Sequence, residues 1–287
     1  LKKWHQLSPD FAHYSFRVAC GLPAHPDTEK FNKWASKHQF NVSDLFPTAP
    51  SNEFKHIDLS VSSTWMGHEK EFNDLDLFQF KIDKLQAENP NKVLAGGYLE
   101  PRPIYTSTAY DKVGNNGRES RTIHLGIDFW FHANTPVHAL FDGEVVTACN
   151  DEGNKEYGGL VILKHCVKGF EFYTLYGHNT VESATKHQLG DIIKKGEKIA
   201  ELGNYPENGN WAPHLHFQVM MSMLDYKIDF PGVAYFKQLN VWKELCPDPN
   251  LLFNSNALKG SNTSTNKELI AYRKQHLGKS LNLHYKT

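Results

Sequence analysis

The strongest constraint on the fold is a long series of short β-type runs, separated by glycine and turn sequences, that begins near residue 96. Runs rich in valine, isoleucine and aromatic residues between such breaks are typical of strands. Residues 157–166 and 170–179 are the clearest examples, and we expect two strands joined by a tight connection at Val167-Lys168-Gly169. The series predicts a mainly β fold of many short strands, as in a β-sandwich or barrel-like core.

Three further segments extend the same pattern. Residues 135–150 predict a strand, a turn at Asp142-Gly143 and a second strand. Residues 189–204 contain short apolar pairs separated by glycines, and residues 214–221 predict one more strand. We therefore expect the β domain to extend over residues 96–253.

The residues before 96 have a different composition and carry no chemical motif. Aromatic residues at helical spacing predict a helix within residues 28–40. Residues 72–88 alternate and then become charged, which predicts a strand followed by a short helix. We expect residues 1–95 to form a mixed α/β N-terminal extension or inter-domain segment.

The chain changes again after the β domain. Residues 254–266 are polar and low in hydrophobicity, which predicts a linker. Residues 267–287 begin with the spacing of a short helix, and we expect them to start a following domain.

Charge and cysteine usage exclude several classes of protein. The net charge of −1 gives no reason to expect a nucleic-acid partner or an anionic membrane partner. No apolar run approaches the ~20 residues that span a bilayer. The four cysteines lie far apart and form no CxxC pair, which favours ordinary thiols in a reducing compartment. Histidine is plentiful, with sixteen residues, so any functional assignment must depend on spacing.

The sequence WAPHLHFQVM, residues 211–220, places two histidines on either side of Leu215. Alternate residues of a strand share a face, so His214 and His216 would point the same way and Leu215 into apolar packing. Two imidazoles on one face suit a metal site, although an exposed strand face also accommodates histidine.

A second candidate pair is His124 and Asp128 in the sequence HLGID. Two ligands of one zinc ion must lie about 3–4 Å apart, because each is roughly 2.0–2.2 Å from the metal. Four steps along a straight strand cover ~13 Å, so the pair can converge only if the chain bends, and Gly126 lies where the bend is needed. The alternative is a surface histidine and a turn aspartate.

One histidine of the HLH sequence can complete a His-Asp-His ligand set. Three protein ligands plus water are typical of an open, catalytic zinc site, whereas structural sites use four ligands. The other histidine would then lie beside the metal and take up or donate a proton. His178 ends a predicted strand between the two motifs and could stabilise the oxyanion of a tetrahedral intermediate.

The order HxGxD, strand-YGH, GDIIKKGEKIAELGN and PHLHF resembles the lysostaphin/LytM-type zinc metallopeptidases over about residues 121–220. The resemblance implies the fold called the duplicated hybrid motif. It also implies one zinc ion held by His124, Asp128 and His216, with His214 as general base or acid and His178 as transition-state stabiliser. The substrate class implied is a glycine-containing peptide, typically in peptidoglycan.

One loop departs from the family pattern, and a second segment has two possible roles. The loop before the HLH sequence is YPENGNW, which is bulkier than usual, and Trp211 would either narrow the groove or pack in the core. Residues 115–118 and Arg121 would either contact a substrate carboxylate or form a solvated loop, and we favour the loop.

The flanks resemble the connecting stretches of large bacterial proteins that join a kinase-like domain, such a metallopeptidase domain and a class-III, pyridoxal-phosphate aminotransferase domain. This second resemblance implies covalently fused neighbours and a cytoplasmic location. An extracytoplasmic location would follow instead if a signal segment were removed from the chain.

The expected function is therefore zinc-dependent hydrolysis of a peptide or peptidoglycan-like amide bond. A latent or non-catalytic module is the first alternative, with a side chain from residues 1–95 covering the metal as a fourth ligand. A small-molecule amide hydrolase within a larger enzyme is the second.

Overall fold

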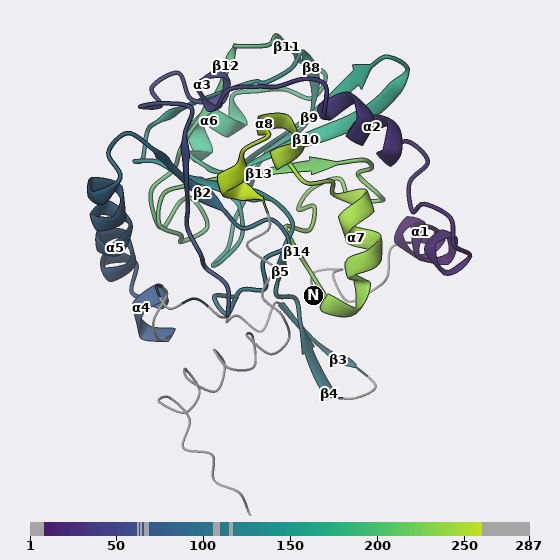
Figure 1. Ribbon diagram of the computed structural model, residues 1–287, viewed down its shortest axis with the longest axis horizontal. Helices are drawn as coiled ribbons and strands as arrows, with labels where there is room; N and C mark the ends of the chain where they lie inside the picture. Colours follow the sequence, from purple (N-terminus) through teal and green to yellow (C-terminus); the bar gives the residue numbers. More distant parts are fainter. Residues whose placement is uncertain are drawn as a thin grey trace, which may run out of the picture.

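The computed structural model describes residues 9–61, 63, 65, 69–105, 110–114 and 117–259, and an eight-stranded sheet lies at its centre (Figure 1). The strand order is β1-β2-β6-β13-β10-β9-β8-β11, antiparallel throughout except for the parallel pair β1-β2. The strands are β1 (Phe54–His56), β2 (Val93–Gly96), β6 (Ile127–Trp130), β8 (Gly143–Asp151), β9 (Gly158–Val167), β10 (Phe170–Asn179), β11 (Ile192–Ile193) and β13 (Leu215–Met220). The mainly β architecture expected from the sequence is confirmed.

Smaller strand pairs and short helices surround this sheet. The pairs are β7 (Pro136–His138) with β12 (Lys198–Glu201), β5 (Ile123–His124) with β14 (Val233–Ala234), and β3 (Asp111–Gly114) with β4 (Gly117–Ser120). The helices are α1 (Pro9–Ala19), α2 (Thr28–Ala35), α3 (Val42–Leu45), α4 (Glu69–Asn73), α5 (Leu75–Glu88), α6 (Val181–Thr185), α7 (Leu239–Leu245) and α8 (Asn250–Phe253), with 3-10 turns at Phe236–Gln238 and Asn256–Leu258. None of the helices in the described ranges is both long and apolar enough to cross a membrane.

The hairpin β9-β10 forms as predicted. Its two-residue turn has positive φ angles at Lys168 (48°) and Gly169 (82°), the combination that matches the right-handed twist of the flanking strands. The pairing buries alternate residues of β9 on opposite faces of the sheet. Val161 and Leu163 pack in one core, and Leu160 and Ile162 pack in the other.

Helices cover both faces of the sheet. The face with Val161 packs against Trp34 of α2, Leu45 of α3 and Phe253 of α8. The opposite face packs against α1 and α7, which are joined by Phe11 and Trp242 with ring centroids 4.8 Å apart. Figure 1 shows α1 beside α7, at the right of the central sheet.

The N-terminal segment has the mixed α/β character expected for it, and two of its strands extend the central sheet. In β2, Gly96 pairs with Asp128 of β6, and β1 adds a parallel edge. The backbone of residues 93–97 thus runs directly beside one strand of the candidate site.

The strand predicted at the start of residues 72–88 is wrong, because this segment forms the helices α4 and α5. The side chain of Asp74 accepts a hydrogen bond from the backbone N–H of Leu77 at 3.0 Å and begins α5. Phe78 and Ile82, four residues apart, then bury one helical face. The apparent alternation arises from exposed apolar residues such as Phe80.

The predicted turn at Asp142-Gly143 does not join a hairpin. The strand before it, β7, pairs with β12, whereas the strand after it, β8, pairs with β9 and β11. The Asp142 carboxylate accepts a hydrogen bond from the backbone N–H of Lys195 at 2.8 Å, so the residue connects two distant loops instead of closing a local turn.

The remaining predictions concern the cysteines and the C-terminal segments. The four cysteines carry free thiols, as expected. The domain expected to start at residues 267–287, and most of the linker expected at 254–266, lie outside the described residues.

Candidate metal centre

The two predicted ligand motifs meet at the middle of the central sheet. The chain bends at Gly126 between β5 and β6, as predicted, and β6 pairs with β13 so that Asp128 lies opposite His216. A Cβ atom on Gly126 would lie 2.7 Å from the carbonyl oxygen of Phe217 and 2.8 Å from Cε1 of His216. Only glycine fits this bend, which brings His124 back toward Asp128 and His216.

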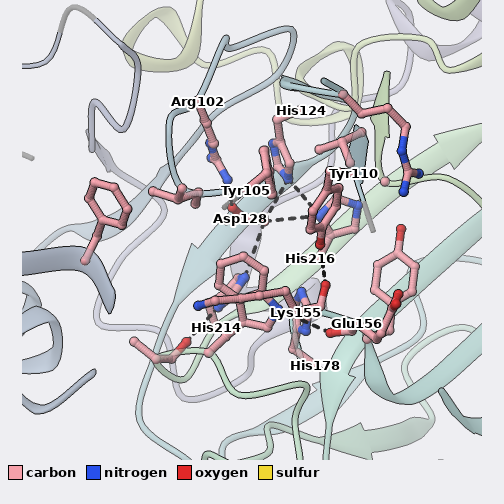
Figure 2. Close-up of a pocket in the computed structure, with 18 of the residues that line it drawn as sticks. Arg102, Tyr105, Tyr110, His124, Asp128, Lys155, Glu156, His178, His214 and His216 are labelled. Carbon is pink, nitrogen blue, oxygen red and sulfur yellow. Dashed lines mark hydrogen bonds and ion pairs between the residues drawn. The ribbon is translucent and has the colours of Figure 1, made fainter. Parts of the chain in front are cut away.

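Three atoms converge at this point (Figure 2). Asp128 Oδ1 lies 3.3 Å from His124 Nε2 and 3.3 Å from His216 Nδ1, and the two nitrogens are 2.8 Å apart. Ligands about 2.0–2.2 Å from one zinc ion are separated by roughly this much. All three side chains are buried, so the group is enclosed by protein.

Hydrogen bonds fix which nitrogen of each imidazole carries the proton. His124 Nδ1 donates to the carbonyl oxygen of Gly97 at 2.9 Å. His216 Nε2 donates to Gln218 Oε1 at 2.9 Å, and the amide nitrogen of Gln218 donates to the carbonyl oxygen of Pro231 at 3.2 Å. The facing nitrogens therefore both present lone pairs.

The third atom, Asp128 Oδ1, has no hydrogen-bond donor among the described residues. Three lone pairs thus point at one place with no proton between them, which is unfavourable without a cation. The residues fit a metal ion, and the nitrogen and oxygen donor set suits zinc.

A buried guanidinium supports the carboxylate from behind. Arg102 Nη1 donates to Asp128 Oδ2 at 2.5 Å, and Arg102 Nε donates to Glu100 Oε2 at 2.7 Å. Burial alone would raise the pKa of Asp128, but His124 and Arg102 outweigh it and hold the pKa well below its usual value. Asp128 therefore stays ionised, as a metal ligand must.

His214 lies next to the three ligand atoms without joining them. Its Nδ1 donates to the carbonyl oxygen of Ala212 at 2.7 Å, so Nε2 is free to accept a proton and lies 3.7 Å from Asp128 Oδ1. The ring stacks on Trp130, with centroids 4.5 Å apart. Burial lowers the pKa of His214 to about 4, so the ring is neutral at pH 7.

His178 occupies the end of β10 in a left-handed backbone conformation (φ 68°). Its ring centroid is 4.5 Å from that of His214, and its Nδ1 donates to the carbonyl oxygen of Asn208 at 2.9 Å. Burial, with His214 nearby, holds the pKa of His178 well below its usual value. All five residues selected from the sequence therefore lie together in one pocket.

The pocket encloses about 730 Å³ of empty space, including the part open to solvent. One wall is apolar and comes from α4 and α5, through Phe72, Leu75 and Phe78. Among the described residues 9–95, no side chain joins the three ligand atoms as a fourth. The covering of the metal by a ligand from this segment is therefore not seen in the described residues.

The open questions about Trp211 and Arg121 have structural answers. Trp211 lines the pocket and is also packed, with its indole N–H donating to the carbonyl oxygen of Glu156 at 3.2 Å. The solvated loop favoured for Arg121 is wrong, because this residue is buried over the ring of Tyr110 and lines the pocket. Residues 115 and 116 lie outside the described residues.

Three residues of the site were not selected from the sequence. The sequence could have indicated Gln218, because this residue follows His216 by two positions and therefore lies on the same face of β13 as His216. Arg102 and Lys155 belong to no motif, and their place in the pocket depends on contacts between distant segments.

Comparison with known proteins finds peptidases among the proteins similar to this chain. The model of peptidase family M23 matches residues 122–227. An uncharacterized metalloprotease of Haemophilus influenzae is 37% identical over 95 residues, which cover 33% of this chain and 18% of that protein. Glycyl-glycine endopeptidase ALE-1 of Staphylococcus capitis is 32% identical over 100 residues, 34% of this chain and 24% of that protein.

Lysostaphin of Staphylococcus simulans is 26% identical over 140 residues, 47% of this chain and 26% of that protein. The solved catalytic domain of that lysostaphin is 25% identical, covers 54% of this chain and 96% of its own, and has a TM-score of 0.33. The chain thus spans about a quarter or less of the full length of these curated relatives.

Proposed function

We propose that the M23 peptidase domain at residues 122–227 is a zinc-dependent hydrolase of a peptide amide bond, with one zinc ion per chain held by His124, Asp128 and His216. The observation that carries this proposal is the convergence of three buried lone pairs, on His124 Nε2, His216 Nδ1 and Asp128 Oδ1. A hydrogen bond from the other nitrogen of each imidazole ring fixes the two histidine lone pairs. When bound, zinc lowers the pKa of a water molecule and polarises the substrate carbonyl.

His214 is the proposed general base. Its Nδ1–H is committed to the carbonyl of Ala212, so the bare Nε2 receives the proton of the attacking water and later delivers it to the leaving amine. Stacking on Trp130 keeps the ring in this orientation.

His178 is proposed to stabilise the transition state, and its hydrogen bond sets a condition for this role. Because Nδ1–H is donated to Asn208, the ring can donate to a substrate oxygen only through Nε2. Donation therefore requires the imidazolium form, which burial disfavours until negative charge develops on the substrate.

The proposed substrate is a glycine-containing, peptidoglycan-like peptide, in line with the glycyl-glycine endopeptidase among the relatives. One observation favours a second candidate, a compact amide. Phe72, Leu75 and Phe78 of α4 and α5 form an apolar wall on one side of the pocket, as in sites that take small molecules. Fusion to neighbouring domains and a cytoplasmic location stay predictions from the flanking sequences.

The test combines zinc content with mass-spectrometric detection of cleavage products. Zinc-loaded protein is incubated with peptidoglycan fragments, glycine-rich peptides and short N-acylated amides. We expect His214→Ala to keep one zinc per chain and lose at least ~10²-fold in rate, and His216→Ala to lose both zinc and activity. The exposed His132→Ala is the matched control and should change neither.

Normal zinc binding by His216→Ala would refute the ligand assignment. Cleavage restricted to the short amides would select the second candidate. No cleavage of any substrate by protein with full zinc occupancy would refute the hydrolase proposal.

A further inference from the structure

Lys155 places an ammonium group in the wall of the pocket that holds the metal centre (Figure 2). The residue is 8% exposed, and no carboxylate in the described part of the chain forms an ion pair with it. Its Nζ donates one hydrogen bond, to the carbonyl oxygen of Asn210 at 3.3 Å, and lies 3.8 Å from the centre of the Trp211 ring.

This arrangement differs from that of two less deeply buried lysines. Lys81 pairs with Glu71 at 2.8 Å, and Lys164 pairs with Glu171 at 2.8 Å. Buried ammonium groups are normally paired in this way, because an uncompensated buried charge is costly. An ammonium has three donors, so Lys155 retains donors that the carbonyl oxygen of Asn210 does not use.

The protein holds Lys155 in place through its backbone. The residue has a left-handed conformation (φ 68°), which is unfavourable for a residue with a Cβ and persists only when its surroundings enforce it. Its N–H donates to the carbonyl oxygen of Gly209 at 2.7 Å, and its carbonyl accepts from the hydroxyl of Tyr110. The backbone of Lys155 is therefore held in place, and its Nζ is held by the Asn210 carbonyl oxygen and the Trp211 ring.

Lys155 lines the same pocket as the proposed catalytic groups. The Trp211 ring beneath it has its centroid 5.9 Å from that of His178 and 6.3 Å from that of His214. The wall that α4 and α5 contribute to this pocket is apolar. Burial lowers the pKa of Lys155 to about 8, so most of the population still carries the charge at pH 7.

We propose that Lys155, supported by Trp211, binds a carboxylate of the substrate close to the scissile bond and so determines specificity for an anionic peptide. The inference rests on the proposed hydrolase function for the identity of the ligand. The carboxylate would come either from the C-terminus of a short peptide or from an acidic side chain. A charge-assisted hydrogen bond in a buried site then selects ligands that carry it.

The test measures equilibrium binding to zinc-loaded protein in the His214→Ala background, so that turnover does not consume the ligands. The probes are N-acetyl-glycylglycine, its C-terminal amide, and N-acetyl-glycylglutamate with an amidated α-carboxyl. Lys155→Met removes the charge and keeps the apolar stem, Lys155→Arg restores a cation, and Lys195→Met is the control. Lys195 lies 5.1 Å from the centre of the Phe40 ring, outside the pocket.

We expect one of the two carboxylate probes to bind roughly 10- to 100-fold more tightly than the neutral amide, and Lys155→Met to remove that preference. Lys155→Arg should recover part of it, and Lys195→Met should leave it unchanged. The probe that is preferred identifies the source of the carboxylate. Zinc content measured on every variant excludes loss of the metal as the cause.

Equal binding of all three probes to the parent protein would overturn the inference, as would a preference that survives in Lys155→Met because the carboxylate binds the metal. These results do not depend on cleavage. Failure of the hydrolase proposal and failure of the Lys155 assignment are therefore separate outcomes.

Discussion

Arg102 donates to one oxygen of Asp128 at 2.5 Å, and the other oxygen of that carboxylate faces His124 and His216. The guanidinium therefore fixes the rotamer of a proposed ligand while also neutralising Glu100. A single buried cation therefore serves two buried carboxylates.

Arg102→Met should destabilise the protein strongly. Removing one partner of a buried ion pair typically costs about 3–5 kcal/mol, because a charge is left buried without compensation. Urea denaturation should show a larger loss for metal-free than for zinc-loaded protein, since the metal partly replaces the cation beside Asp128. Lys33→Met, which breaks the exposed pair with Glu29, is the control and should have little effect. Equal effects of the two variants would contradict the prediction.

Gln218→Leu should weaken zinc binding while leaving the fold intact. The amide accepts the Nε2–H of His216 and so keeps Nδ1 free for the metal. Loss of such a partner typically lowers metal affinity by about 10- to 100-fold. Competition with a chelator would measure the change, and Gln188→Leu at an exposed position is the matched control. Unchanged affinity would show that the ring is oriented without the amide.

Gly126→Ala should disrupt the metal centre directly. The added methyl would lie 2.7 Å from the carbonyl oxygen of Phe217, in the strand that also carries His216. We expect loss of stoichiometric zinc together with a destabilisation of roughly 1–3 kcal/mol from overpacking. Gly190→Ala meets no atom within 4 Å and should keep its zinc, although its positive φ (91°) adds some strain. Full zinc occupancy in Gly126→Ala would show that the bend can relax.

His165 should make folding less stable in acid. It is buried in the core, where Nδ1 donates to the carbonyl of Asp142 and Nε2 accepts from the hydroxyl of Thr174. Burial lowers its pKa to about 4, so between pH 6.5 and 4 the unfolded chain binds more protons than the folded one. Its contribution, at most about 3 kcal/mol, is complete above pH 6.5 and is lost as pH falls toward 4.

Urea midpoints of metal-free protein at pH 7.5 and pH 5 would test this. The pH dependence should be smaller in His165→Gln than in the parent, whereas the exposed His132→Gln should leave it unchanged. The quantity compared is the change in urea midpoint between the two pH values, because the substitution itself also lowers stability at every pH. An unaltered slope in His165→Gln would assign the acid sensitivity to other buried histidines.

Much of the site could be predicted because its chemistry is local in sequence. The requirement that His124 and Asp128 converge placed a bend at Gly126, and the period of a strand placed Leu215 and His216 on opposite faces. The turn of the β9-β10 hairpin has the backbone that its sequence demands. Each of these follows from distances spanned by a few residues.

The features that the sequence did not predict depend mostly on contacts between residues that are distant in the chain. The strands predicted on either side of Asp142-Gly143 do form, but the pairing of β7 with β12 depends on residues about 60 positions away, and local spacing cannot predict it. Arg102 meets Asp128 across 26 residues, and Lys155 reaches its place through contacts with residues 209–211. At residues 72–88, apolar residues on the exposed side of a helix imitated the alternation of a strand.

The contacts of β2 and of the segment after it determine which part of the chain a recombinant fragment must contain for this site to form. The carbonyl of Gly97 that orients His124, and the Arg102 guanidinium that holds Asp128, both precede the residues matched by the family model. Glu100 is in turn held by the backbone N–H of Leu59. A recombinant fragment trimmed to residues 122–227 would keep every proposed ligand and lose the groups that aim two of them. Cloning boundaries for a working centre, or for grafting it onto another scaffold, therefore have to begin no later than β1.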